Sequence, residues 1–124
     1  MKKYAIEVCV ETAYLEQESS PDENQFVFAY TISIHNAGSV AAQLLSRHWI
    51  ITNADNKVYQ VQGEGVIGEQ PYLEPGQTYQ YTSGAMIDTP VGTMQGSYHM
   101  VAADGALFEA EISPFILAMP NKLH

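Results

Sequence analysis

The chain has 124 residues, 46% of them hydrophobic, and a formal net charge of -9 from 14 acidic and 5 basic residues. This length fits one domain over residues 1–124, and the hydrophobic fraction is high enough to exclude global disorder. The acidic balance argues against binding to nucleic acid, whose partners neutralise phosphates with clustered lysines and arginines, and against an anionic membrane surface.

A single cysteine, Cys9, excludes an internal disulfide and a cysteine-based zinc cage. The start, "MKKYAIEVCV", resembles a signal peptide for six residues, but Glu7 and Glu11 interrupt its apolar run. No stretch is long enough to span a bilayer as a helix. We therefore expect a soluble protein of a reducing compartment, without membrane insertion.

Alternation of apolar and polar residues with a period of two predicts strands throughout the chain. The stretch "FVFAYTISIH" (26–35) is the clearest case, because every second residue from Phe26 to Ile34 is a large apolar one. No window sustains the i, i+3, i+4 spacing of an amphipathic helix, so we expect no long helix. We predict about seven strands, at 4–12, 26–36, 43–53, 57–62, 77–83, 93–103 and 106–117.

Turn chemistry separates these strands. "NADNK" near Asn56 and "AADGA" near Gly105 have the residues of hairpin turns, and "EPGQ" at 74–77 has those of a type II turn. "ESSPDENQ" (18–25) and "NAGSVAAQ" (36–43) are predicted as polar loops. Seven short strands at this spacing predict an all-β sandwich of the immunoglobulin-like or fibronectin type III-like kind.

The strand 43–53 has a conflicting pattern. Arg47 would share a face with Leu45 and Trp49, whereas His48 would lie on the opposite face. Either both faces are covered or a β-bulge shifts the register. Trp49 lies on the third strand, where a sandwich often buries its tryptophan. For Arg47 we expect an ion pair with a half-buried glutamate. The alternative is an anion or ion-pair site formed by Arg47 beside His48.

The stretch "GEGVIGEQP" (63–71) contains the spacing G-x-G-x-x-G of a dinucleotide-binding loop. That motif needs a helix immediately after it, and here Pro71, Pro75 and Gly76 disfavour one. A β-bulge or a tight crossing between sheets explains the glycines better. The functional alternative is a flexible partner-binding loop, for which the candidate residues are Gly63, Glu64, Gly65, Val66, Ile67 and Gly68.

Catalytic and metal-binding patterns are weak. The chain has no G-x-S-x-G sequence, and its histidines at 35, 48, 99 and 124 are far apart. The calcium-loop pattern fails at Val58, where glycine is required. We therefore expect no catalytic residue, no metal ligand set and no cofactor.

The stretches "LLSRHW", "GEGVIGEQP", "YTSG" and "TPVGTMQGSY" closely resemble the ApaG family, and the resemblance extends over nearly the whole chain. It implies a fibronectin type III-like sandwich, a bacterial cytoplasmic protein and a link to cobalt resistance and magnesium efflux. Related domains in eukaryotic proteins imply an interaction role. Ala85 follows "YTSG", so this chain offers no cysteine at that position.

These inferences predict a non-enzymatic protein-interaction module that influences cobalt and magnesium homeostasis through an unidentified protein partner. One alternative is direct binding of divalent cations. Another is nucleotide or pyrophosphate binding through the loop 63–68. The sequence does not indicate an oligomeric state.

Overall fold

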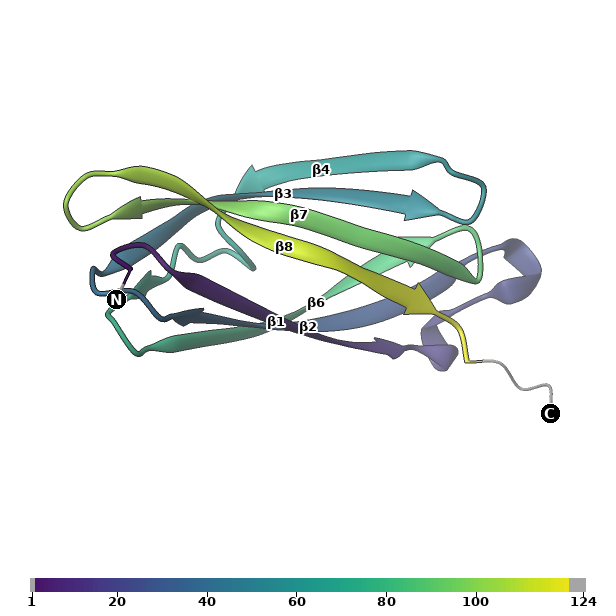
Figure 1. The fold of residues 1–124 in the computed structure, drawn as a ribbon. Coiled ribbons are helices and arrows are strands. Elements are labelled where there is room, and N and C mark those ends of the chain that lie inside the picture. The colour runs from purple at the N-terminus through teal and green to yellow at the C-terminus, as the bar shows by residue number, and fades with distance from the viewer. Residues whose placement is uncertain (1, 121–124) are drawn as a thin grey trace.

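Two antiparallel sheets pack face to face in the computed structural model, which describes residues 2–120 (Figure 1). The strands, in chain order, are β1 (Ile6–Tyr14), β2 (Phe26–Asn36), β3 (Ala42–Asn53), β4 (Val58–Glu64), β5 (Tyr72–Leu73), β6 (Thr78–Ile87), β7 (Val91–Ala102) and β8 (Leu107–Ala118). One sheet has the order β1-β2-β6. The other has the order β4-β3-β7-β8, with β5 also paired to β3. The predicted all-β sandwich is confirmed.

Alternate residues of β2 supply one side of the core, as the period of two predicted. Phe26, Phe28, Tyr30, Ile32 and Ile34 are all buried, and the residues between them are half-buried. Leu44, Tyr98 and Leu117 are among the residues that cover this face from the opposite sheet. Side chains alternating in and out of a pleated strand explain why one strand contributes so much of the core.

The conflict in β3 is resolved by a β-bulge. The pairing of β3 with β7 shifts register between Leu44 and Ser46, which adds one residue to β3 at Leu45. An extra residue reverses which parity faces the core. Leu44 is therefore buried before the bulge, and Trp49 is buried after it.

Strands β4 and β5 pair with the same edge of β3. Glu64 is opposite Ser46 and Tyr72 is opposite Gln43, so residues 65–71 form a long excursion within one interrupted edge strand. The prediction of seven strands was one short, because β5 was not among them. A two-residue strand between Pro71 and Pro75 has no periodicity from which to detect it.

The remaining local differences are small. The loop before β2 contains two single-turn 3-10 helices, η1 (Glu16–Glu18) and η2 (Pro21–Glu23). The predicted turns are confirmed: Asn56, Gly76 and Gly105 all have positive φ, which these residue types tolerate. In the described part of the chain, no helix is long and apolar enough to cross a membrane.

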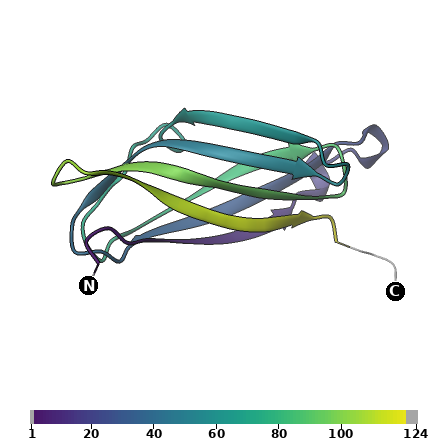
Figure 2. The ribbon, with the colours of Figure 1, turned by 45° about the horizontal axis from the view of Figure 1, so that its top comes forward.

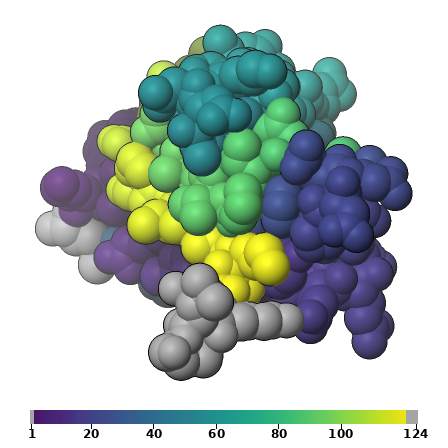
Figure 3. Space-filling model, turned by 90° about the vertical axis from the view of Figure 1, so that its right-hand side faces the viewer, coloured from purple at the N-terminus to yellow at the C-terminus, as the bar shows by residue number. Residues whose placement is uncertain are grey.

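The two open sides of the sandwich differ. On one side β1 of the first sheet contacts β8 of the second. On the other side the edge strands β4 and β6 belong to different sheets and are not paired with each other in the described chain. Strand β4 lies along the top of both ribbon views (Figure 1 and Figure 2). Figure 3 shows the end of the molecule at which the loop around η2 lies near the turns after β3 and β6. The side between β4 and β6 holds the site described next.

Candidate functional site

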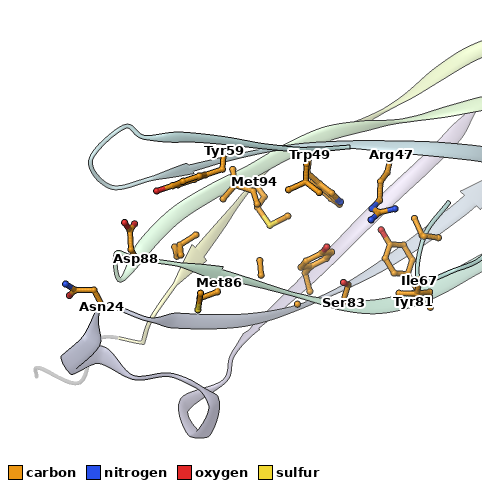
Figure 4. Close-up of a pocket in the computed structure, with 17 residues that line it drawn as sticks. Asn24, Arg47, Trp49, Tyr59, Ile67, Tyr81, Ser83, Met86, Asp88 and Met94 are labelled. Atoms are coloured by element: carbon orange, nitrogen blue, oxygen red, sulfur yellow. The ribbon is translucent and has the colours of Figure 1, made fainter. Parts of the chain in front are cut away.

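A cleft of about 620 Å³ lies between the edge strands β4 and β6. Its walls are mainly apolar and come from both sheets (Figure 4). Arg47 and Ile67 lie toward one end, and Asn24 and Asp88 toward the other. The lining residues are Asn24, Tyr30, Arg47, Trp49, Ile51, Tyr59, Val61, Val66, Ile67, Tyr81, Ser83, Gly84, Ala85, Met86, Ile87, Asp88 and Met94. Pockets for small organic ligands commonly have volumes of about 300–1,000 Å³ and this apolar character.

The Trp49 side chain forms part of the inner wall of the cleft. The residue is 2% exposed, and its ring makes edge-to-face contacts with Tyr30 and Phe115. Its indole nitrogen Nε1 is the one buried side-chain polar atom of residues 2–120 without a hydrogen-bond partner. An unsatisfied buried donor costs about 1–3 kcal/mol, so this N–H requires an explanation.

Arg47 lies two residues before Trp49 and faces the same side of β3. Its Nη1 donates hydrogen bonds to the carbonyl oxygens of Glu64 (3.1 Å) and Gly65 (2.8 Å). Within residues 2–120 no carboxylate lies within ion-pair distance of this guanidinium, since the ion pair found there joins His99 to Glu109. The predicted Arg47–glutamate pair is therefore wrong, because backbone carbonyls take the place of the carboxylate.

The first two glycines of the G-x-G-x-x-G stretch allow close approach. A Cβ at Gly63 would lie 2.8 Å from Nη1 of Arg47, so the missing side chain makes room for the guanidinium. A Cβ at Gly65 would lie 2.2 Å from the carbonyl oxygen of Glu69, and this glycine has φ of +61°. These glycines therefore serve an interrupted edge strand. No helix follows them in the described chain, which continues into β5.

The tip of the excursion is a two-residue turn. Val66 and Glu69 exchange both backbone hydrogen bonds, at 2.8 and 2.9 Å, around Ile67 and Gly68. Both central residues have positive φ, 42° and 81°, as a type I′ turn requires. Val66 is fully buried in the core, whereas Ile67 is 56% exposed at the mouth of the cleft. Of the two apolar residues proposed for partner binding, only Ile67 is accessible.

Two tyrosines join the sheets behind the cleft. The hydroxyls of Tyr81 on β6 and Tyr98 on β7 lie 2.6 Å apart in a buried hydrogen bond. Burial raises the pKa of both hydroxyls well above the usual value for tyrosine. Both hydroxyls are therefore neutral near pH 7, and the hydrogen bond between them connects β6 to the opposite sheet.

His35, His48 and His99 lie outside the cleft, and His124 is outside the described residues. His48 points to the outer face of its sheet, where Nε2 is 2.9 Å from Oε1 of Gln60, so Arg47 and His48 do not form one site. His99 lies between Ser46, at 2.9 Å, and Glu109, at 3.2 Å. This line of side chains crosses an exposed sheet face away from the cleft. Among residues 2–120 no three histidine, cysteine or acidic residues are close enough to hold a metal ion.

Arg47 and the loop 63–68 were predicted from the sequence as candidate site residues. The cleft that Arg47, Val66 and Ile67 line together was not predicted. Tyr59 and Val61 of β4 and Met86 of β6 line its mouth, and all three are exposed. The available signal was the pair of large apolar residues Tyr59 and Val61 at alternate positions of the predicted strand 57–62, whereas Met86 lies beyond the predicted strand 77–83. The sequence did not show that these strands lie on the same open side.

The fold and the cleft define a small immunoglobulin-like or fibronectin type III-like sandwich with a mainly apolar cleft at its open edge. A family model described as the ApaG domain matches residues 16–102. A protein ApaG from Thiobacillus denitrificans is 62% identical over 99% of this chain and 97% of its own length. One from Pseudomonas putida is 57% identical over 98% and 97%. The chain belongs to the ApaG family.

Solved structures agree with the fold. A protein from Bordetella pertussis described as a putative ApaA protein has 50% identity and a TM-score of 0.94, with 98% of each chain covered. A distant likeness, at 14% identity and a TM-score of 0.51, covers 92% of this chain and 15% of a Bacteroides uniformis β-glucuronidase 2. The second likeness shows the sandwich fold alone.

Proposed function

We propose that this chain is a non-enzymatic protein-interaction module that binds a protein partner through the rim of the cleft. The rim consists of Tyr59, Val61, Ile67 and Met86. The partner links the chain to cobalt and magnesium homeostasis, in agreement with the role that family resemblance implies, and the expected compartment is the cytoplasm.

The single observation behind this proposal is the exposure of the rim. Four large apolar side chains from β4, β6 and the excursion surround one opening, and Met86 is 61% exposed. Apolar residues grouped around one opening mark binding surfaces more often than single exposed ones do. The free edges of β4 and β6 add unpaired backbone groups, to which an extended segment of a partner could pair.

Ile67 adds an argument from backbone strain. It is a β-branched residue at positive φ, and it is exposed, so its identity contributes little to the local fold. Strained backbone that persists at a surface is more often found at functional sites. An apolar side chain at the tip of a turn also has the form of an interface anchor.

The experiment is site-specific photo-crosslinking in cells. Benzoylphenylalanine replaces Tyr59 or Met86 at the rim. The control replaces Leu107, which is 76% exposed on β8 at the opposite edge of its sheet. We expect one discrete adduct from the rim positions and none from position 107. The purified partner should then bind the wild-type chain at least ten-fold more tightly than the Met86→Lys variant.

Cation handling is tested separately. In a host that lacks its own copy, wild type should restore growth in cobalt, and Met86→Lys should not. Equal restoration by a folded Met86→Lys chain would contradict the partner model. Stoichiometric binding of cobalt at micromolar affinity by the purified chain alone would favour direct cation binding instead.

A further inference from the structure

Beneath the rim, the cleft has two hydrogen-bond donors without suitable acceptors. The indole N–H of Trp49 is buried and has no partner in the described chain. Arg47 uses Nη1 for two backbone carbonyls, and the structure gives its Nε and Nη2 no acceptor within residues 2–120. Both side chains line the same cleft, and Figure 4 shows both directed between the two sheets.

We propose that the cleft binds a small organic acid with an aromatic body, whose carboxylate accepts hydrogen bonds from Trp49 Nε1 and Arg47. This inference goes beyond the proposed function and does not depend on it. A ligand beneath the rim can bind whether or not a protein partner covers the rim.

Charge determines the polar group of this ligand. Arg47 and Lys57 are the basic residues between positions 4 and 121, and Lys57 is exposed in the turn before β4. A half-buried guanidinium without a carboxylate partner favours an anion, and its planar donors match the two oxygens of a carboxylate. The indole N–H alone would also donate a hydrogen bond to a neutral carbonyl oxygen, but the neighbouring positive charge of Arg47 favours the acid.

Geometry supports a single carboxylate between the two donors. Residues two apart on a strand point to the same face, with their Cα atoms about 7 Å apart. A carboxylate has two oxygens about 2.2 Å apart, so it can accept one hydrogen bond of about 2.9 Å from each of two donors that face the same space. The apolar lining then determines the body of the ligand.

The lining favours an aromatic body over a charged or flexible one. Met86 and Met94 face the cleft together with Tyr30 and Trp49. Thioether sulfur and aromatic rings make favourable contacts with an aromatic ring. Asp88, at the far end of the cleft, repels a second negative charge, so a monocarboxylate fits better than a dicarboxylate.

The test uses the single tryptophan, which gives one indole N–H signal in a proton–nitrogen correlation spectrum. The probe is 3-phenylpropionate, and the matched controls are 3-phenylpropanol, which lacks the charge, and acetate, which lacks the ring. We expect a saturable downfield shift of the indole proton with the acid. The alcohol should bind at least ten-fold more weakly, and acetate should not saturate.

Two further measurements identify the site. Nuclear Overhauser contacts should connect the ring protons of the probe with the methyl groups of Met86 and Met94 in the wild-type chain. Arg47→Met should weaken binding of the acid at least ten-fold and leave that of the alcohol unchanged. The wild-type comparison of acid with alcohol decides the question even if that variant does not fold.

Three results would overturn the proposal. One is the absence of a saturable shift up to about 5 mM acid, a level at which even a weak site is occupied. The second is equal affinity for the acid and the alcohol, which would show that Arg47 and Trp49 do not favour a negatively charged ligand over a neutral one. The third is a chemical shift of the indole proton that does not change with the acid but changes when the protein partner is added. That result would show that a side chain of the partner occupies the cleft.

Discussion

Replacing Ile67 by asparagine should leave the protein as stable as before or make it more stable. Ile67 occupies the first central position of the type I′ turn at φ of 42°. The left-handed region costs an ordinary L-residue about 1–2 kcal/mol, and asparagine tolerates it far better than a β-branched residue does. Asparagine is also among the preferred residues at this turn position.

The lost contacts partly offset this gain. Full burial of an isoleucine side chain stabilises a fold by about 1.5–3 kcal/mol. Because Ile67 is 56% exposed, less than half of that applies, or about 1 kcal/mol. The free energy of unfolding should therefore rise by about 0–1 kcal/mol in Ile67→Asn.

Two neighbouring substitutions serve as controls. Ile67→Val retains the β-branch and its strain, so it should give no gain. Val66→Ala removes buried atoms from a residue with no exposure and should cost about 2–3 kcal/mol from lost transfer free energy and the cavity left behind. Equilibrium unfolding in urea, followed by the fluorescence of Trp49, measures all three. A loss of 1 kcal/mol or more in Ile67→Asn would refute the reasoning and make the side chain part of the core.

Two further predictions concern the buried pair of tyrosine hydroxyls, 2.6 Å apart. Tyr81→Phe and Tyr98→Phe should each cost about 1–3 kcal/mol by leaving the other hydroxyl unsatisfied, and the double variant should cost less than their sum. Additive costs in urea unfolding would show that the hydroxyls do not depend on each other. Burial raises the folded-state pKa of both residues, so their contribution is complete below pH 10 and is lost at higher pH. Stability should then fall by up to about 1.4 kcal/mol per pH unit for each tyrosine, and the double phenylalanine variant should flatten this slope between pH 10 and 11.5.

Most of the fold was predictable because alternation is a local property. In β2 each residue from Phe26 to Asn36 alternates as expected, and the turns at Asn56 and Gly105 follow from residue type alone. The β3 conflict was also visible, but the bulge could not be placed. The position of the bulge depends on how β3 pairs with β7, and the residues of β3 alone do not determine that pairing.

The site was only half predictable, for two physical reasons. Arg47 was recognised as a basic residue among apolar ones. Its hydrogen-bond acceptors are the backbone carbonyls of Glu64 and Gly65. Because every residue has a backbone carbonyl, the sequence does not show which ones act as acceptors. The cleft depends on two edge strands far apart in the sequence standing on the same open side. That arrangement follows from how the two sheets pack, which local patterns do not specify.

Departures from local rules gather at this cleft, and their distribution supports a functional origin. Asn24, Asn56 and Ile67 are the non-glycine residues of the described chain at positive φ, and two of them are the residue type that tolerates it. Ile67 is a β-branched residue at positive φ at the mouth of the cleft. Trp49, whose indole N–H is unpaired, lines the cleft. Arg47, a cation without a carboxylate in residues 2–120, lies between them.

Backbone strain, an unpaired donor and an uncompensated charge have unrelated causes, so random imperfections would be scattered over the molecule. The strain at Ile67 and the unpaired indole N–H of Trp49 each cost stability, and each could be removed by a single substitution. Sequences that retain such costs together in one place usually do so at a binding site. Because an anionic oxygen would satisfy two of the three and a contact at the rim would use the third, one occupied cleft explains all of them.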